Sequence, residues 1–196
     1  MAAPLALPSG GRTRPRNVIN LTVLMVVTGG MALFGALIGV YAGLGSGLSR
    51  WPPSGVTIDN YVGTMLSLTA IMSAVTVEWA WHAIKRQDRA QAMWGLLLTA
   101  GFGLAFLNLL WFVGRQVNFG PGNTKVGPFA VIFFAMIVAS GFVALIGVVA
   151  LLMALGRTLG NQMTVTNNEM IRAVAWYWDF VVIAWLAVYT TVWLFV

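Results

Sequence analysis

The chain alternates between five long apolar stretches and short segments that are polar or rich in proline and glycine. Each apolar stretch holds about 20 residues or more. A helix rises about 1.5 Å per residue, so each stretch is long enough to cross a hydrocarbon core of roughly 30 Å. The pattern therefore predicts an all-α polytopic membrane protein with five transmembrane helices. The predicted spans are residues 18–44, 61–84, 92–113, 128–156 and 173–196.

Residues 1–17 precede the first span and show no hydrophobic periodicity. We interpret them as a disordered basic N-terminal tail, followed by one transmembrane domain over residues 18–196. A signal peptide is the alternative, because a basic tail followed by an apolar run is typical of one. The run over residues 18–44 is longer than a signal core of about 7–15 residues, which favours a retained first span.

The composition leaves almost no room for a soluble domain. Hydrophobic residues make up 59% of the chain and charged residues 8%, whereas soluble domains carry about 25% charged residues. The chain contains no cysteine, which excludes disulfides, thiolate metal sites and cysteine nucleophiles.

Positive charge is distributed unevenly over the segments between the spans, and this predicts the orientation. Eight Lys and Arg residues fall on one side and three on the other. Cytoplasmic segments carry the excess of Lys and Arg, so we predict a cytoplasmic N-terminus and an outside C-terminus. The same rule accounts for the net charge of +6 without a nucleic-acid partner. The larger group is Arg12, Arg14, Arg16, Lys85, Arg86, Arg89, Arg157 and Arg172; the smaller is Arg50, Arg115 and Lys125.

Small residues recur at helical spacing in the first and fourth spans. Such stripes allow the backbone of another helix to approach closely. The alternative is that glycine is simply common in membrane helices. The candidate helix-packing residues are Gly35, Gly39 and Gly43 in the first span and Ser140, Ala144 and Gly147 in the fourth.

Three ionisable residues lie near the predicted inner ends of the second and fifth spans. Glu78 and His82 are four residues apart and so share one helix face; Asp179 lies in the fifth span. An acid inside a span is a functional-site candidate, and a structural ion pair with His82 or a neighbouring basic residue is the alternative for Glu78. If the three side chains meet, they form a polar cluster that contacts a lipid head group or a partner.

The sequence carries no motif for chemistry of its own. It lacks a phosphate-binding glycine loop, a metal-binding helix motif and a serine–histidine–acid set. His82 is the only histidine, so the chain alone cannot build a multi-histidine metal site or a bis-histidine haem site. We therefore predict a subunit of a larger membrane complex, with no catalytic, metal-binding or cofactor-binding residue on this chain.

The fifth span resembles the last helix of subunit III of haem–copper cytochrome oxidases. Further pieces fall in the same order as in that family, and the similarity covers roughly residues 25–196. Five spans with the N-terminus inside is the topology of the short bacterial form of that subunit. The matching pieces are Tyr177-Trp178-Asp179-Phe180-Val181, Trp185, Tyr189-Thr190-Thr191-Val192-Trp193, Trp51-Pro52-Pro53, Asp88-Arg89, Leu97-Leu98-Thr99, Gly103-Leu104-Ala105-Phe106-Leu107 and Arg157.

The chain departs from this family's pattern at nearly all of its polar positions. Glu78 stands where the family usually has an amide or a small residue. Elsewhere the family's polar residues are replaced: its first-span Glu by Gly30, its third-span Gln and Glu by Leu110 and Val113, its fourth-span histidines by Ser140 and Val143, and its last-span His and Asp by Asp179 and Val182.

The resemblance implies a non-catalytic component of a respiratory haem–copper (cytochrome c) oxidase. Haem and copper would then reside on partner chains, and the partners would be catalytic subunit I, other respiratory subunits and phospholipid. The implied location is the bacterial inner or plasma membrane. Two alternatives remain: a small homo-oligomeric transporter or channel with Glu78 facing a water-filled path, and an assembly or accessory protein of an oxidase or nitric-oxide reductase.

Overall fold

The computed structural model of the chain describes residues 18–47, 51–123, 126–160 and 169–194. The predicted basic tail over residues 1–17 lies outside the described residues. So do Arg50 and Lys125, two of the three basic residues assigned to the outer side.

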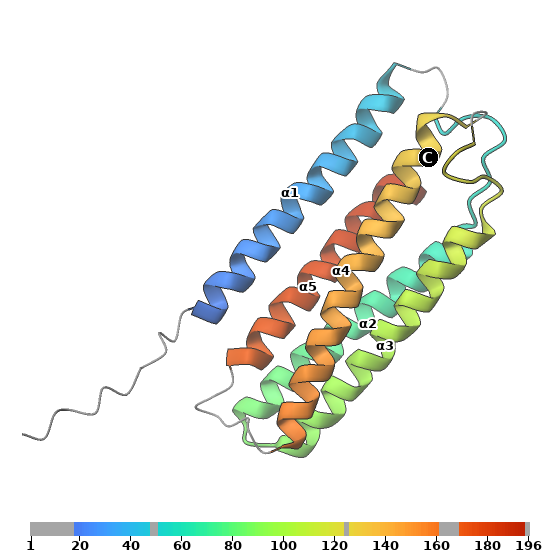
Figure 1. The fold of residues 1–196 in the computed structure, drawn as a ribbon. Coiled ribbons are helices and arrows are strands. Elements are labelled where there is room, and N and C mark those ends of the chain that lie inside the picture. Colours follow the sequence, from blue (N-terminus) through green and yellow to red (C-terminus); the bar gives the residue numbers. More distant parts are fainter. Residues whose placement is uncertain (1–17, 48–50, 124–125, 161–168, 195–196) are drawn as a thin grey trace, which may run out of the picture.

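Five helices make up nearly all of the described residues, and these contain no strand. All five are long and apolar enough to cross a membrane, which confirms the predicted all-α, five-span fold. Consecutive helices run in opposite directions, so the first and last described residues lie at opposite ends of the bundle (Figure 1). The helices are α1 Val18–Ser46, α2 Asn60–Lys85, α3 Arg89–Gln116, α4 Pro128–Leu159 and α5 Glu169–Tyr189, and α5 continues into a π-helical turn, Thr190–Leu194.

Local capping explains why the helices reach beyond the apolar stretches. Asp59 accepts a hydrogen bond from the backbone N–H of Tyr61 (2.9 Å), and Asp88 accepts one from that of Gln91 (3.0 Å). Each bond satisfies a donor that an N-terminal helix turn leaves unpaired. Pro128 is the first residue of α4. Its missing N–H costs little there, because a backbone N–H at that position has no acceptor within the helix.

Helix α5 lies at the centre of the bundle. It packs against α1, α2 and α4, and Figure 1 shows it between α1 and the other helices. Of its most apolar 18-residue window, 67% is buried inside the chain, compared with 6% for α1. The helix that carries the most specific sequence motifs is therefore also the core element.

Helix α1 lies at the edge of the bundle and contributes two buried residues, Phe34 and Tyr41. Phe34 packs edge-on against Phe180 of α5, with 6.3 Å between ring centroids. The ring of Tyr41 packs edge-on against that of Trp51, with 5.5 Å between ring centroids. Most of the α1 surface therefore faces away from the chain.

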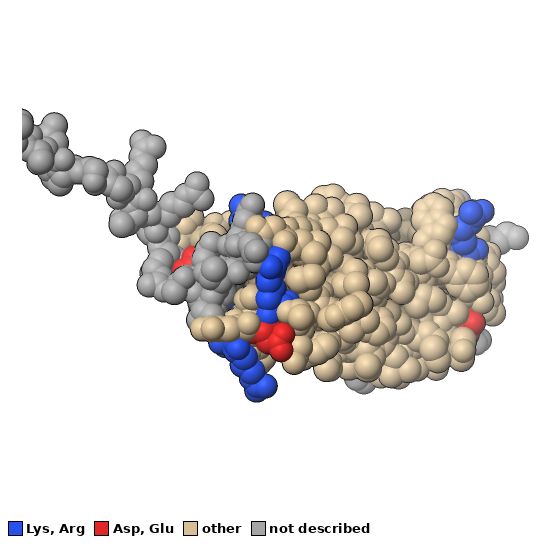
Figure 2. Space-filling model, turned by 90° about the horizontal axis from the view of Figure 1, so that it is seen from below, with Lys and Arg blue, Asp and Glu red and all other residues tan. Residues whose placement is uncertain are grey.

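Charged side chains lie toward the two ends of the molecule, and the middle of the face in Figure 2 carries none. A charge-free band is expected where side chains face hydrocarbon, because a charged group there is costly. The distribution fits a bundle that crosses a membrane along its long axis.

Candidate functional site

Glu78 and His82 lie in the last two turns of α2 and contact each other. The His82 Nδ1 atom is 3.7 Å from Glu78 Oε2 and 2.8 Å from the backbone oxygen of Glu78, which accepts a hydrogen bond from Nδ1–H. Their side chains are 36% (Glu78) and 55% (His82) exposed. The shared face expected from their spacing is therefore present, and it lies at the rim of the bundle rather than in its core.

Asp179 of α5 approaches the same place from the neighbouring helix. Its carboxyl group lies close enough to that of Glu78 for the two to interact electrostatically. The structure thus brings Glu78, His82 and Asp179 together, with Glu78 in the middle. Two carboxylates this close repel each other unless one holds a proton. We name these three residues the inner polar cluster; its binding of a lipid head group or partner stays a prediction.

Replacing Glu78 with glutamine is expected to raise the free energy of unfolding slightly, by about 0.5–1 kcal/mol at neutral pH. The amide removes a like charge and offers an N–H donor to Asp179. The check is the thermal unfolding midpoint of the purified chain in mild detergent, with Arg86→Gln, which removes the charge of an exposed side chain at the same end of the bundle, as a control. A clear loss of stability in Glu78→Gln would show instead that the glutamate charge is needed in the fold.

A series of indole hydrogen bonds joins the C-terminal helix to α2 along its length, and the sequence alone did not reveal it. Ser67 and Ser73 of α2 each accept one of these bonds, and each serine hydroxyl also donates a hydrogen bond to a backbone carbonyl of α2. The indole N–H groups of Trp178, Trp185 and Trp193 donate to Ser73 Oγ (2.9 Å), Ser67 Oγ (3.2 Å) and the carbonyl oxygen of Asp59 (3.2 Å), respectively. The signal in the sequence was the two-turn spacing of Trp178 and Trp185.

The two small-residue stripes have different surroundings. Ser140, Ala144 and Gly147 are buried, and a Cβ atom at Gly147 would lie 2.7 Å from the ring of Trp178. At Gly147 this stripe therefore faces α5. On α1, a Cβ added at any of the predicted glycines would meet nothing within 4 Å among the described residues, so packing by that stripe stays a prediction and would need a surface outside them. These glycines are Gly35, Gly39 and Gly43.

Apolar packing occupies the position where the resemblance places a first-span glutamate. A Cβ atom at Gly30 would lie 2.3 Å from the ring of Phe180, so the aromatic ring takes the space that a longer side chain would need. Val182, which stands at another of the family's polar positions, is buried as well. Phe180 on α5 thus fits the absence of a side chain at residue 30 on α1.

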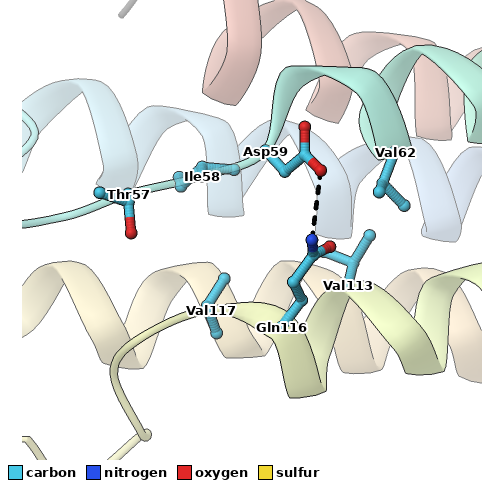
Figure 3. Close-up of a pocket in the computed structure, with 7 residues that line it drawn as sticks. All are labelled: Thr57, Ile58, Asp59, Val62, Val113, Gln116 and Val117. Carbon is cyan, nitrogen blue, oxygen red and sulfur yellow. Dashed lines mark hydrogen bonds between the residues drawn. The ribbon is translucent and has the colours of Figure 1, made fainter.

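A small pocket lies at the other end of the bundle, between the start of α2 and the end of α3 (Figure 3). Its volume is about 200 Å³. Gln116 Nε2 donates to Asp59 Oδ2 across it (3.2 Å), and Asp59 Oδ1 caps α2. Both carboxylate oxygens are thus held by the chain, and the pocket is a polar junction between two helices. Its lining residues are Thr57, Ile58, Asp59, Val62, Val113, Gln116 and Val117.

Among the residues that the structure describes, no group of three or more His, Cys, Asp or Glu side chains is arranged to hold a metal ion. The inner polar cluster brings together one imidazole and two carboxyl groups without forming such a site.

Comparison with known proteins gives one consistent result. The family model for cytochrome c oxidase subunit III matches residues 17–196. The chain is 32% identical to cytochrome c oxidase subunit 3 of Locusta migratoria over 145 residues, 73% of this chain and 54% of that protein. It is 33% identical to that of Drosophila melanogaster over 146 residues, 74% of this chain and 55% of that protein.

A third relative, cytochrome c oxidase subunit 3 of Spodoptera frugiperda, is 31% identical over 144 residues. These make up 72% of this chain and 96% of that sequence. The chain spans about half the length of the locust and fly relatives it matches.

Proposed function

The chain belongs to the cytochrome c oxidase subunit III family, and we propose that it is a non-catalytic subunit of a respiratory haem–copper oxidase complex. In this role it flanks the catalytic subunit and stabilises it. Haem and copper reside on partner chains. The family match supports the kind of complex. The sequence carries no motif for redox chemistry of its own, which fits a non-catalytic subunit.

The observation that carries the proposal is the extent of the family match. It covers residues 17–196, and hence all five helices. The motifs of the last span are also those of the central helix, where Trp178 and Trp185 are each 1% exposed. The likeness therefore lies in the residues that hold the bundle together. It favours the oxidase role over the alternative of an independent transporter.

The finer assignments are part of the same proposal. The partners are the catalytic oxidase subunit I, other respiratory subunits and phospholipid. The location is the bacterial plasma membrane, with the N-terminus in the cytoplasm, as the Lys and Arg count predicts. The inner polar cluster lies at the cytoplasmic end in this orientation, where it contacts a lipid head group or a partner subunit.

Helix α1 supplies the surface for such a contact. Its apolar residues include Leu24, Met25 and Met31, each more than half exposed (51–66%). A surface of this kind is expected to meet hydrocarbon or another transmembrane helix. In a complex, this surface can pack against a transmembrane helix of another subunit.

Affinity purification of the full chain in mild detergent is expected to bring down a large catalytic subunit with its haem. Visible absorption would then show haem bands, and mass spectrometry would identify the partners. A chain with α1 intact is required, because α1 has the smallest share of its apolar window buried inside the chain, 6%.

A haem-free preparation that contains only this chain would contradict the proposal. Glu78 would then be the residue to test, by proton flux in liposomes with and without Glu78→Gln. Co-purification at levels far below those of the catalytic subunit would instead indicate an assembly factor. Partners of the nitric-oxide reductase type would move the chain to the accessory role in that complex.

A further inference from the structure

A series of oxidisable rings runs along α5 and ends in a tyrosine at the end of the bundle where Asp59 lies. The ring centroids of Trp185 and Trp193 are 5.8 Å apart, and Tyr189 stacks on Trp193 at 5.8 Å. Trp178 lies about 10 Å further along the helix axis. In a chain without cysteine, indole and phenol rings are the side chains that lose a single electron most readily. We name these four residues the aromatic series.

The π-helical turn at the end of α5 keeps Trp193 in line with the other two indoles. Trp193 follows Trp185 by eight residues, which in an α-helix would turn it about 80° away around the axis. The wider turn over Thr190–Leu194 offsets this rotation, because a π-helix has more residues per turn. Trp193 thereby reaches the carbonyl oxygen of Asp59 on α2. All three indoles therefore donate to the same neighbouring helix.

The hydrogen bonds of the two central indoles leave an oxidised ring its proton. Trp178 and Trp185 donate to serine hydroxyls, and both hydroxyls donate in turn to backbone carbonyls. Neither a hydroxyl nor an amide carbonyl is a strong enough base to take the N–H proton. An oxidised indole at these positions therefore stays a radical cation. Such a cation is a strong oxidant and takes an electron from the next ring.

Tyr189 differs from the indoles because its phenol can release a proton to water. Its hydroxyl lies 3.0 Å from Thr64 Oγ1, which itself donates to the carbonyl of Asn60, so the Tyr189 O–H is the donor between the two. Thr64 is exposed and lies one turn from the start of α2. Tyr177, by contrast, donates to the backbone carbonyl of Val143, which cannot take a proton. Loss of the proton traps the oxidised state at Tyr189.

We propose that the aromatic series carries oxidising equivalents from the membrane interior to water, and so protects the core of the bundle from lipid-derived radicals. The oxidant is a lipid alkoxyl radical. It takes one electron from a central indole and becomes an alkoxide, which takes a proton from water to give the alcohol. Each ring then takes one electron from the next, until Tyr189 has lost one electron and released its proton to water.

A water-soluble reductant of the ascorbate class returns one hydrogen atom to the Tyr189 radical and restores the phenol. The aromatic series therefore ends each cycle unchanged, while one alkoxyl radical has become an alcohol and one reductant has been oxidised. This role depends on the fold of the chain alone, so it is independent of membership of an oxidase complex.

The test uses the full chain in phospholipid vesicles that contain linoleic acid hydroperoxide. Ferrous iron cleaves the peroxide bond and produces the alkoxyl radical inside the membrane. The reference chain carries Tyr61→Phe, because that phenol is 68% exposed and would react directly. Electron paramagnetic resonance of freeze-quenched samples distinguishes a tyrosyl radical from an indole radical. We expect a tyrosyl signal in the reference chain and its loss in Tyr189→Phe, with an indole radical in its place.

Two further variants interrupt the aromatic series and keep an aromatic ring at the position. Trp185→Phe leaves about 22 Å along the axis between the remaining indoles, a distance at which direct electron transfer is slow. Trp193→Phe removes the ring on which Tyr189 stacks. Loss of the tyrosyl signal is expected in both. Because they act at different points, a folding defect in one leaves the other as a test.

Trp94→Phe and Trp111→Phe are the matched controls. Each makes the same exchange on α3 at a ring that is 60% (Trp94) or 69% (Trp111) exposed and lies outside the aromatic series. Both are expected to give the tyrosyl signal of the reference chain. A purely structural role of the series would not produce this difference between buried and exposed indoles.

Three results would overturn the proposal. The first is a reference chain that shows indole radicals and no tyrosyl radical. The second is a tyrosyl signal that persists in Tyr189→Phe. The third is a tyrosyl signal that persists in a folded Trp185→Phe or Trp193→Phe chain, which would mean that the lipid radical oxidises Tyr189 directly and that the indoles serve packing alone.

Discussion

Trp178→Ala is expected to lower the free energy of unfolding by about 3–5 kcal/mol, because it opens a cavity at the centre of the bundle. The Trp178 side chain is 1% exposed and packs onto the glycine backbones of α3 and α4 at Gly103 and Gly147. Its loss also removes the indole donor to Ser73. Surrounding helices are too closely packed to collapse fully into the space.

The measurement is unfolding in detergent micelles followed by near-ultraviolet circular dichroism, which reports on tryptophan packing. Trp94→Ala is the matched control: Trp94 is 60% exposed, and we expect a change within about 0.5 kcal/mol there. Trp178→Phe separates the contribution of the cavity from that of the hydrogen bond, because it keeps much of the side-chain volume and removes the indole donor to Ser73. Similar losses for Trp178→Ala and Trp94→Ala would contradict the central role of α5.

Gly95→Val is expected to cost about 3 kcal/mol by forcing α2 and α3 apart. A Cβ atom at Gly95 would lie 2.8 Å from Ala80 Cβ and 3.0 Å from both the Cα and the N of Ala80. Backbone atoms cannot rotate away as a side chain does, so the helices themselves must move. The contact between α2 and α3 is the most extensive in the bundle.

Gly101→Val on the same helix provides the control, because its Cβ would meet nothing within 4 Å. Both variants add the same branched side chain to α3 and so carry the same helix-propensity cost. The difference between their unfolding midpoints therefore isolates the packing term. Equal midpoints would mean that α2 and α3 adjust to the added side chain at no cost.

The sequence was sufficient for the five helices, because hydrophobic length is a strong signal in a membrane. It could not show which helices meet. Glu78 and His82 share a face by local spacing alone, whereas the approach of Asp179 depends on α5 lying against α2. Helical spacing does not contain that information.

The glycine stripes illustrate the same limit. Four-residue spacing places Gly35, Gly39 and Gly43 on one face of α1, but it does not say what that face meets. The sequence analysis does not single out Gly95 as a packing residue, yet a Cβ atom there would lie 3.0 Å from backbone atoms of Ala80 on α2. Close approach depends on residues of both helices, so the spacing of small residues along one helix does not predict which helix it meets.

The central place of α5 also bears on the order of synthesis. Because α5 leaves the ribosome after α1 to α4, these four helices enter the membrane before the element that lies among them exists. Until it arrives, Ser67 and Ser73 lack their indole partners, and Gly147 faces no Trp178. A nascent chain interrupted before α5 thus lacks the side chains that fill the centre of the finished bundle, above all Trp178 and Trp185.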